Sequence, residues 1–260
     1  MPDIGQLPTV SIITVVYNRA STIAAAIESV INQTSDSIEY IVIDGMSNDG
    51  TDKVIDQYRD EISRVIREPD SGLYDALNKG IEAASGDVIG FVHADDMLDA
   101  SDIVASFQEK FASENYDAIY GNLLYVDSED ISKIIRYWTP GEYRRSRFRD
   151  GWMPPHPTVF LKRSAYLEHG LYRTDLGSAA DYECLIRLLY KSELKTGYLD
   201  RIVSRMRIGG ESNSSLRNRL NANSLDRKAW LENGYKPPFA LRLKKPLSKL
   251  PQYFNRPRPR

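Results

Sequence analysis

The chain has 260 residues, with 42% hydrophobic and 27% charged side chains and a formal net charge of −2. These values are typical of a globular protein with a full core and exclude a strongly basic nucleic-acid-binding protein. The single cysteine, Cys184, excludes an internal disulfide and is typical of a reducing compartment. The first eight residues lack the pattern of a secretory signal, and no apolar run approaches the ~20 residues of a membrane span. We therefore expect a cytoplasmic protein.

Charge is distributed unevenly along the chain. Residues 236–260 contain eight Lys or Arg and no Asp or Glu, whereas residues 1–235 hold 26 basic and 36 acidic side chains. Six prolines follow Tyr235, which argues against one continuous helix in this stretch. We therefore expect a single domain over residues 1–235 and a separate basic, proline-containing tail over residues 236–260.

The first hundred residues alternate between strand-like and helix-like patterns. Buried strands are expected at 9–17, 38–44, 62–66 and 88–93. Helices are expected after Ser21, which we take as a cap, then from Thr51 as the cap to about residue 58, and over 73–84. This alternation predicts an α/β fold with parallel crossovers and helices on both faces of the sheet.

The second half is less regular. Helices are expected at 101–112, 181–191 and 216–232, strands at 118–126, 131–138 and 158–162, and a basic loop at 144–150. In open parallel sheets, ligands bind beyond the carboxyl ends of the strands. The segments at those ends are Tyr17-Asn18-Arg19, Asp44-Gly45, Glu68-Pro69-Asp70 and Asp95-Asp96. We therefore expect an acid-rich binding site at this edge.

The pair Asp95-Asp96 follows the apolar run of residues 88–94. Adjacent carboxylates repel each other, and Mn²⁺ or Mg²⁺ bridging a phosphorylated ligand is a common way to hold them. The alternative is an exposed turn, because Asp is common in turns.

Other residues suggest a bound nucleotide on the same edge. Asp44 ends a strand, where a carboxylate can accept a hydrogen bond from a base or ribose. Asp75, Asn78 and Lys79 share one face of the expected helix over 73–84, with Lys79 and Asn78 directed at a phosphate or base. The alternatives are a turn residue for Asp44 and a solvated helix face for the others. Gly80 inside that helix predicts a close backbone approach.

Two further residues are candidates on the other half of the chain. Asp181 begins a helix, where it stays ionised, as a general base must at neutral pH. The alternative is plain helix capping. His156 is a titratable ring between prolines, and its alternatives are a packed loop or a core histidine. The chain has no P-loop, no G-x-G-x-x-G, no zinc spacing and no G-x-S-x-G elbow.

Taken together, the ordered motifs resemble those of known enzymes. They are residues 8–18, Ile41-Val-Ile-Asp-Gly45 with Ser47-Asn-Asp-Gly-Thr51, Asp70-Ser-Gly-Leu-Tyr-Asp-Ala-Leu-Asn-Lys-Gly80, Gly86-Asp87 and His93-Ala-Asp-Asp96. In this order they resemble the bacterial family 2 glycosyltransferases, particularly the small colanic-acid-type and O-antigen transferases. The resemblance covers residues 8–215, most strongly up to residue 100.

The resemblance implies a GT-A fold, with a mostly parallel, Rossmann-like sheet flanked by helices and a smaller irregular acceptor-side region. Residues 8–100 would form the nucleotide-sugar half and residues 101–235 the acceptor half. It implies a non-processive, inverting hexosyltransferase that uses Mn²⁺ or Mg²⁺ and a UDP or GDP sugar. The acceptor would be a saccharide, in surface polysaccharide synthesis a lipid-linked one.

The resemblance also carries residue roles. Asp96 and Asp95 match the acidic, DXD-like metal motif. Donor-binding positions would be Thr14, Tyr17, Asn18, Asp44, Asp75, Asn78, Lys79, His93 and Asp95. Asp181 matches the general base; because Ala180 replaces the Glu common there, Glu183 is the alternative. Arg207 belongs to a segment that closes over the diphosphate, and His156 would lie on the acceptor side.

Two other classes remain as alternatives: a nucleotide-binding module without turnover, and a sugar-phosphate nucleotidyltransferase. The latter class opens with a Gly-rich loop after the first strand, which Tyr17 to Ser21 lacks. No Gln-x-x-Arg-Trp of the processive synthases is present. The tail mixes basic with apolar residues, which suggests peripheral binding to an anionic membrane; the alternative is a disordered terminus or a strap on the acidic body.

Overall fold

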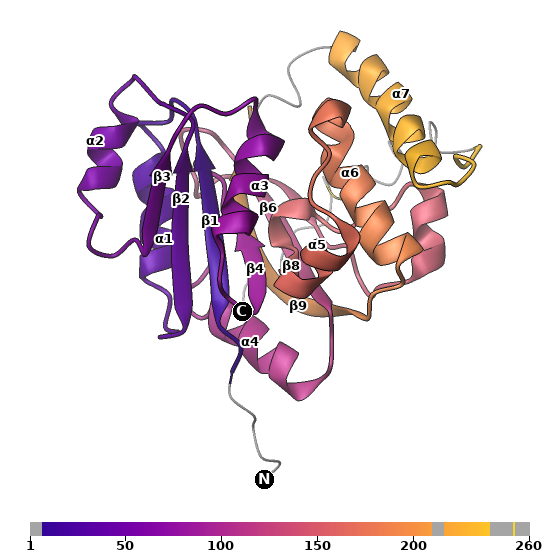
Figure 1. Cartoon of the computed structure of the whole chain (residues 1–260), viewed down its shortest axis with the longest axis horizontal. Helices are drawn as coiled ribbons and strands as arrows, with labels where there is room; N and C mark the ends of the chain where they lie inside the picture. Colours follow the sequence, from indigo (N-terminus) through magenta and orange to yellow (C-terminus); the bar gives the residue numbers. More distant parts are fainter. Residues whose placement is uncertain (1–6, 210–215, 240–251, 253–260) are drawn as a thin grey trace.

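A nine-stranded, mostly parallel sheet forms the centre of the protein (Figure 1). The structure, a computed structural model, describes residues 7–209, 216–239 and 252. Within them the strand order is β3-β2-β1-β4-β8-β6-β9-β5, and β7 pairs with β6. The strands are β1 (Val10–Val16), β2 (Ile38–Asp44), β3 (Arg64–Arg67), β4 (Val88–Phe91), β5 (Asp96–Leu98), β6 (Ala118–Val126), β7 (Ile134–Trp138), β8 (Phe160–Lys162) and β9 (Thr196–Arg207).

Helices cover both faces of this sheet, as the alternation predicts. The α-helices are α1 (Ile23–Ile31), α2 (Thr51–Asp56), α3 (Leu73–Ala83), α4 (Ile103–Ser113), α5 (Arg163–His169), α6 (Ala180–Leu185) and α7 (Leu216–Glu232). Successive side chains of a strand point to opposite faces. Accordingly, Ile13 and Val15 join a core with α3, α6 and α7, whereas Ile12 and Val16 join a core with α1 and α4. In Figure 1, α3 lies in front of the sheet and α1 behind it.

The first four strands bring their carboxyl ends to one edge. β1 pairs in parallel with both β2 and β4, and β2 pairs in parallel with β3. In this register Val16 lies beside Asp44, and Asp44 lies beside Arg67. The polar residues that follow these strands therefore meet at the same edge.

The second half differs from the prediction in one respect that matters for the site. The strand expected over 88–93 ends at Phe91, and Asp96 begins the short strand β5. β5 runs antiparallel to β9, with Asp96 opposite Met206. The twelve-residue β9 was not predicted, nor was α5. Asp96 is thus held by strand pairing, whereas Asp95 lies in the partly exposed turn just before β5.

Several local details also correct the prediction. Thr22, rather than Ser21, is the residue before α1, and its side chain makes no capping bond. Thr51 is the first residue of α2, preceded by Gly50 in a left-handed conformation. The segment expected as a loop at 144–150 contains the 3₁₀-helix η1 (Arg145–Asp150). The helix expected over 181–191 is α6 followed by η4 (Ile186–Lys191), a π-helical turn.

Short 3₁₀-helices connect the acceptor-side elements. They are η2 (His156–Thr158) and η3 (Thr174–Ala179). Residues 240–251 and 253–260, which make up most of the predicted tail, lie outside the described residues, as do residues 210–212 of the predicted closing segment. Among the described helices, none is both long enough and apolar enough to cross a membrane.

Gly80 lets helix α3 approach the sheet closely, as its place in the sequence suggests. A Cβ at this position would lie 2.4 Å from Cγ2 of Ile13 on β1. Ile13 is fully buried and β-branched, so its side chain has little freedom to move. The glycine therefore sets how near α3, with its polar face, stands to β1.

We expect Gly80→Ala to destabilise the protein although alanine is the better helix former by about 1 kcal/mol. Overpacking against Ile13 should outweigh that gain and lower the free energy of unfolding by about 1 kcal/mol net. Urea denaturation measures this value. In an Ile13→Ala background the same change should be neutral or stabilising, because the clash is gone. A more stable single variant would contradict the close approach.

Candidate functional site

The acidic pair lies at the carboxyl edge of the sheet, against the end of β9. The backbone N–H of Arg207 donates to Asp96 Oδ1 over 3.3 Å, and the Arg207 guanidinium donates to the carbonyl of Asp95 over 2.7 Å. Asp96 is 2% exposed, whereas Asp95 is partly exposed. Burial raises the pKa of the Asp96 carboxyl well above its usual range, and the charge of Asp95 adds to this. The structure thus brings Asp95, Asp96 and Arg207 together.

The acidic pair fits a divalent cation. The second carboxylate oxygen of Asp96, Oδ2, is buried and has no hydrogen-bond partner within residues 7–209, 216–239 and 252. A buried carboxylate oxygen without a donor is costly, and a hard cation is a ligand that such an oxygen accepts. No group of three or more His, Cys, Asp or Glu side chains suited to a metal occurs among the described residues. A cation here would therefore take its remaining ligands from phosphate and water.

Asp44 lies buried at the end of β2. Its Oδ1 accepts from the backbone N–H of Ser47 over 2.9 Å, and its Oδ2 lies 3.1 Å from Nε of Arg67. The Arg67 guanidinium also donates to the carbonyl of Ser47 over 2.7 Å and pairs with Asp52 over 3.1 Å. Arg67 ends β3 and was not among the predicted site residues. It links the loop after β2 to the neighbouring strand.

The end of β1 carries three predicted donor-binding residues in different environments. Thr14 is fully buried, and its hydroxyl lies 3.0 Å from that of Tyr40. Tyr17 is exposed. Asn18 has a positive φ of 52°, and its Oδ1 accepts from the backbone N–H of Asn48 over 2.9 Å. Tyr17 and Asn18 therefore lie at the open edge, and Thr14 lies beneath it.

Helix α3 directs its predicted residues to two places. Lys79 pairs with Glu68 over 3.0 Å and lies 3.7 Å from Asp75. Asp75 also accepts from the backbone N–H of Ser71 over 2.9 Å. The amide of Asn78 instead bonds the backbone of Tyr172, on the acceptor side, through both of its polar atoms. Direct nucleotide contacts of these three residues stay a prediction.

Asp181 and Glu183 differ in their surroundings. Asp181 is partly exposed, and its Oδ1 accepts from the backbone N–H of Tyr182 over 2.6 Å. Glu183 is buried, and its two oxygens accept from Arg187 over 3.0 and 3.1 Å. Asn233 adds a third bond to Glu183 over 3.2 Å. Glu183 is therefore part of the packing between α6, η4 and the end of α7.

His93 lies in the connection between β4 and β5, two residues before Asp95. Burial lowers the pKa of His93 to about 4, the neighbouring His156 adds to this, and the charges of Asp95 and Asp181 oppose it. The rings of His93 and His156 stack with centroids 6.2 Å apart. Burial also lowers the pKa of His156 to about 4, so both rings are neutral at physiological pH. The structure thus places His156, from the acceptor half, next to the donor-side residue His93.

A groove of about 330 Å³ lies between the start of α3 and η3. Residues 71–75, at the start of α3, line one side, and Thr174, Gly177 and Ser178 of η3 line the other. Tyr74, in this wall, accepts a hydrogen bond from the backbone of Asp181. The groove therefore opens beside the start of α6 and offers hydroxyl groups, a carboxylate and an aromatic ring.

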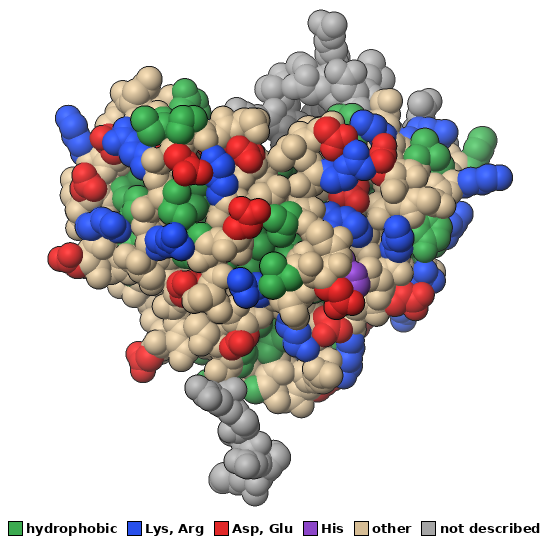
Figure 2. Space-filling model, viewed as in Figure 1, with side chains coloured by type: hydrophobic (Ala, Val, Ile, Leu, Met, Phe, Trp, Pro, Cys, Tyr) green, Lys and Arg blue, Asp and Glu red, His purple; other side chains and the backbone are tan. Residues whose placement is uncertain are grey.

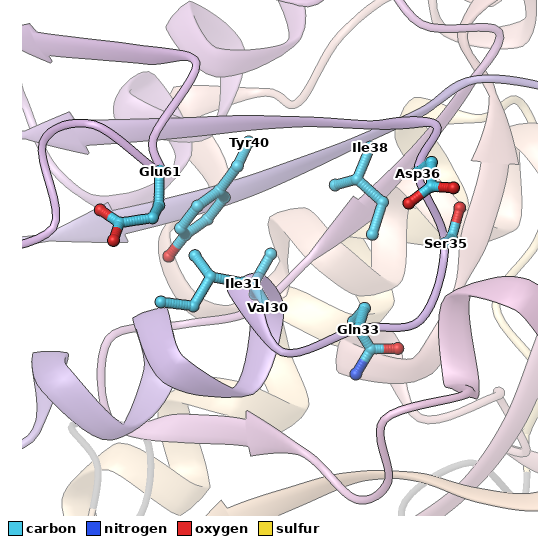
Figure 3. Close-up of a pocket in the computed structure, with 8 residues that line it drawn as sticks. All are labelled: Val30, Ile31, Gln33, Ser35, Asp36, Ile38, Tyr40 and Glu61. Atoms are coloured by element: carbon cyan, nitrogen blue, oxygen red, sulfur yellow. The ribbon is translucent and has the colours of Figure 1, made fainter.

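A second pocket lies away from these residues. It has a volume of about 190 Å³ and lies between α1 and β2 (Figure 3). Ile38 begins β2, and Glu61 precedes β3, so this pocket lies at the amino ends of the strands. On the face seen in Figure 2, acidic and basic side chains are interspersed rather than gathered by sign. The polar groups of the carboxyl edge therefore remain the candidate site.

The fold is similar to that of solved glycosyltransferases of the GT-A type. The mannosyltransferase PcManGT from Pyrobaculum calidifontis, solved with GDP-Man and Mn²⁺, superposes with a TM-score of 0.66 over 98% of this chain and 75% of its own, at 19% identity. TarS residues 1–349 of S. aureus, solved with UDP-GlcNAc, give a TM-score of 0.66 over 95% and 78%, at 18% identity. In the structure of TarS that gives a TM-score of 0.67, the match spans 39% of that chain.

Sequence comparison adds the family. The family profile "Glycosyl transferase family 2" matches residues 11–169. An uncharacterized glycosyltransferase of Mycobacterium tuberculosis is 32% identical over 183 residues, which cover 69% of this chain and 68% of that protein. The chain belongs to glycosyltransferase family 2, as its motifs suggested.

Three residues of this region were not among the predicted ones: Arg67, Tyr74 and Tyr172. Arg67 ends a short strand that was predicted to end at Ile66, and the polar segment taken to follow that strand began at Glu68, so Arg67 fell between the two. Tyr74 lies inside the motif that carried the resemblance and could have been found there. Tyr172 stands in a segment without periodicity, and no signal in the sequence marks it.

Proposed function

We propose that this protein transfers a hexose from a nucleotide-sugar donor to an acceptor hydroxyl, with inversion at the anomeric carbon. The observation that carries the proposal is the arrangement of charge around His93. The charge of Asp95, which adjoins Asp96, and the charge of Asp181, on α6, both raise the pKa of this ring against the effect of its burial. Direct displacement needs a group for the departing diphosphate and a base for the incoming hydroxyl.

Asp96, with Asp95 beside it, would hold Mn²⁺ or Mg²⁺ on the departing side. The unpartnered Oδ2 of Asp96 supports this assignment. Such a cation supplies charge stabilisation to the leaving diphosphate when it is bound. Arg207 adds a fixed positive charge next to the same pair, since its guanidinium bonds the carbonyl of Asp95. The Mn²⁺ in the mannosyltransferase neighbour is consistent with this choice.

Asp181 would act as the base on the acceptor side. Its carboxylate takes the proton of the acceptor hydroxyl while that oxygen bonds the anomeric carbon and the bond to the diphosphate breaks. The groove between α3 and η3 would receive the acceptor, because Tyr74 in its wall accepts a hydrogen bond from the backbone of Asp181. Glu183 is less suited to this role, since Arg187 binds both of its oxygens in the interior.

The donor nucleotide in this proposal is UDP or GDP. The two solved neighbours were obtained with UDP-GlcNAc and with GDP-Man. Thermal unfolding with UDP, GDP and TDP sugars, each with and without Mn²⁺, would identify the base. A ligand at a hundred times its Kd stabilises by about 2.7 kcal/mol, which is readily measured. Binding of a sugar nucleotide without any release of nucleoside diphosphate would instead support a non-catalytic module.

The first prediction concerns the metal. Turnover should require Mn²⁺ or Mg²⁺, and Asp96→Ala should remove nearly all activity while the fold persists, because it deletes the buried ligand oxygen. Release of the nucleoside diphosphate measures turnover, and circular dichroism reports the fold. Asp99→Ala is a matched control, since Asp99 follows β5 directly and pairs with Arg205 on β9. Full activity in excess EDTA would exclude this assignment.

The second prediction concerns the base. Asp181→Asn keeps the size of the side chain but cannot take a proton, so kcat should fall by about 10²-fold or more with donor affinity little changed. Glu183→Gln should act differently, by weakening a buried ion pair and lowering the free energy of unfolding by about 3 kcal/mol. Kinetics and urea denaturation separate the two effects. If a folded Glu183→Gln is the variant with the larger loss of kcat, the base is Glu183.

We further propose that residues 236–260 attach the protein peripherally to an anionic membrane, where a lipid-linked acceptor would lie. The eight basic residues, with apolar residues between them, support this proposal, because each basic residue near such a surface contributes about 1 kcal/mol. Phe239, near the start of this segment, is fully exposed. The alternative of a strap on the body is supported by Gln252, which is partly buried.

The third prediction tests this attachment. A chain ending after Tyr235 keeps the packing of Tyr235 on Trp230 and Tyr190, so it should fold. Only the full chain should sediment with anionic liposomes, and less so at high salt, because salt screens the attraction. Neutral liposomes are the control. Equal sedimentation of the two proteins would favour the strap.

A further inference from the structure

Tyr172 joins the two halves of the protein through its backbone. Its N–H donates to Oδ1 of Asn78, and its carbonyl accepts from Nδ2 of Asn78, each over 2.8 Å. Asn78 lies on α3 of the donor half, 94 residues earlier in the chain. Both polar groups of the amide are thus used in a paired contact that resembles one rung of a β-ladder. This contact fixes the position of Tyr172 relative to α3.

The side chain of Tyr172 continues this connection into the interior. Its buried hydroxyl lies 2.6 Å from Nε2 of His156 and 3.1 Å from the hydroxyl of Tyr166. Burial raises the pKa of the Tyr172 hydroxyl far above its usual range, so the group stays protonated. His156 is 8% exposed, and a buried ring nitrogen that loses its partner carries a substantial desolvation cost. Tyr172 therefore holds the His156 ring in one orientation.

His156 in turn packs on the end of β4. Its ring stacks on Phe91 with centroids 5.8 Å apart and on His93 with centroids 6.2 Å apart. His93 stands two residues before Asp95, in the short connection between β4 and β5. The orientation of His156 therefore bears on the connection that carries the acidic pair.

A second contact ties Tyr172 to the start of α6. The Tyr74 ring, from the first turn of α3, packs on the Tyr172 ring at 5.7 Å, and the Tyr74 hydroxyl accepts from the backbone of Asp181. Tyr172 thus contacts His156, whose ring stacks on His93 near the acidic pair, and Tyr74, which bonds to the backbone of Asp181. Neither the acidic pair nor Asp181 is in direct contact with Tyr172 among the described interactions.

We infer that Tyr172 is a positioning residue of the transfer site. It sets the position of the β4–β5 connection, which carries His93, relative to α6, which carries Asp181. The inference rests on the proposed function for its kinetic part, because it concerns the two groups assigned to donor and acceptor. Its structural part, the coupling of Tyr172 to His93 through His156, does not depend on turnover. Substitutions next to directly acting residues commonly cost 10- to 100-fold in activity or metal affinity.

The test compares Tyr172→Phe with Tyr166→Phe. Tyr172→Phe keeps the ring and the backbone bonds to Asn78 and removes only the hydroxyl. Tyr166→Phe removes a neighbouring buried hydroxyl but leaves the bond between Tyr172 and His156. The chain has three histidines, so ¹⁵N-histidine labelling gives a spectrum in which His93, His156 and His169 are assigned by substitution. Each spectrum is recorded on the full chain with and without Mg²⁺ and UDP.

We expect Tyr172→Phe to shift the signals of both His156 and His93 and to lower kcat for release of the nucleoside diphosphate about tenfold. Tyr166→Phe should leave the His93 signal and kcat near their wild-type values, although its thermal midpoint falls by a similar amount. An unchanged His93 signal in folded Tyr172→Phe would overturn the inference, as would equal losses of kcat in the two variants. A wild-type protein that releases no nucleoside diphosphate would refute the proposed function, and the histidine spectra would still decide the coupling.

His156→Gln provides the second variant if Tyr172→Phe fails to fold. The Gln amide can reach the Tyr172 hydroxyl but cannot stack on His93. The inference requires that His156→Gln, like Tyr172→Phe, shifts the His93 signal and lowers kcat. If the bond between Tyr172 and His156 is merely structural, the Gln amide should replace it and keep kcat at its wild-type value. Wild-type kcat in a folded His156→Gln protein would show that the stacked ring of His156 has no effect on turnover, and would overturn the inference.

Discussion

The structure depends on the burial of the Asp96 carboxyl next to a second carboxyl, at the edge of an apolar sheet. Burial opposes the charged form of such a group, and the neighbouring Asp95 opposes it further. The protein offers Asp96 a single backbone donor, from Arg207, and leaves its other oxygen without a partner. The short strand β5 pairs with the long strand β9 at this point, and the pairing of Asp96 opposite Met206 holds the carboxyl in place. An arrangement so unfavourable in isolation is typical of a site whose missing charge comes from a ligand.

The halves of the chain meet at this pair through α3. Gly80 lets the helix approach β1, and the same helix then presents Tyr74 and Asn78 to the acceptor side. Groups of the first and second halves of the chain therefore depend on each other's positions. The same helix, α3, bonds to the backbone before α6 and also packs on β2, which ends at Asp44. A change in the distance of α3 from the sheet would alter both sides together.

The sequence predicted the parallel half of the fold well because its signals are local. β1, β2 and α3 have unbroken apolar patterns bounded by turn residues, and their bounds differ little from those expected. β9 was missed because its pattern is interrupted. Its pairing with β6 shifts between Tyr120 and Asn122. Arg201 pairs with an acidic residue at the start of α4, and Arg205 pairs with one on the loop after β5. Charges that are neutralised by distant partners make a strand look like a loop. The candidate site followed the same rule, since Asp95, Asp96, Asp44 and Asp181 stand in motifs, whereas Tyr172 owes its place to a contact with a residue 94 positions away.

The geometry of a helix explains why only one of the two candidate bases can face the groove. Residues two apart on an α-helix are separated by about 200° around its axis, so Asp181 and Glu183 point to nearly opposite sides. One side of α6 faces the interior, where Arg187 and Asn233 bind Glu183, and this buried contact fixes the rotation of the helix. With Glu183 held inward, Asp181 is turned to the side of Tyr74 and His93. The two carboxylates of this short helix thus have different surroundings: Glu183 is held in the interior by Arg187 and Asn233, and Asp181 lies on the side of Tyr74.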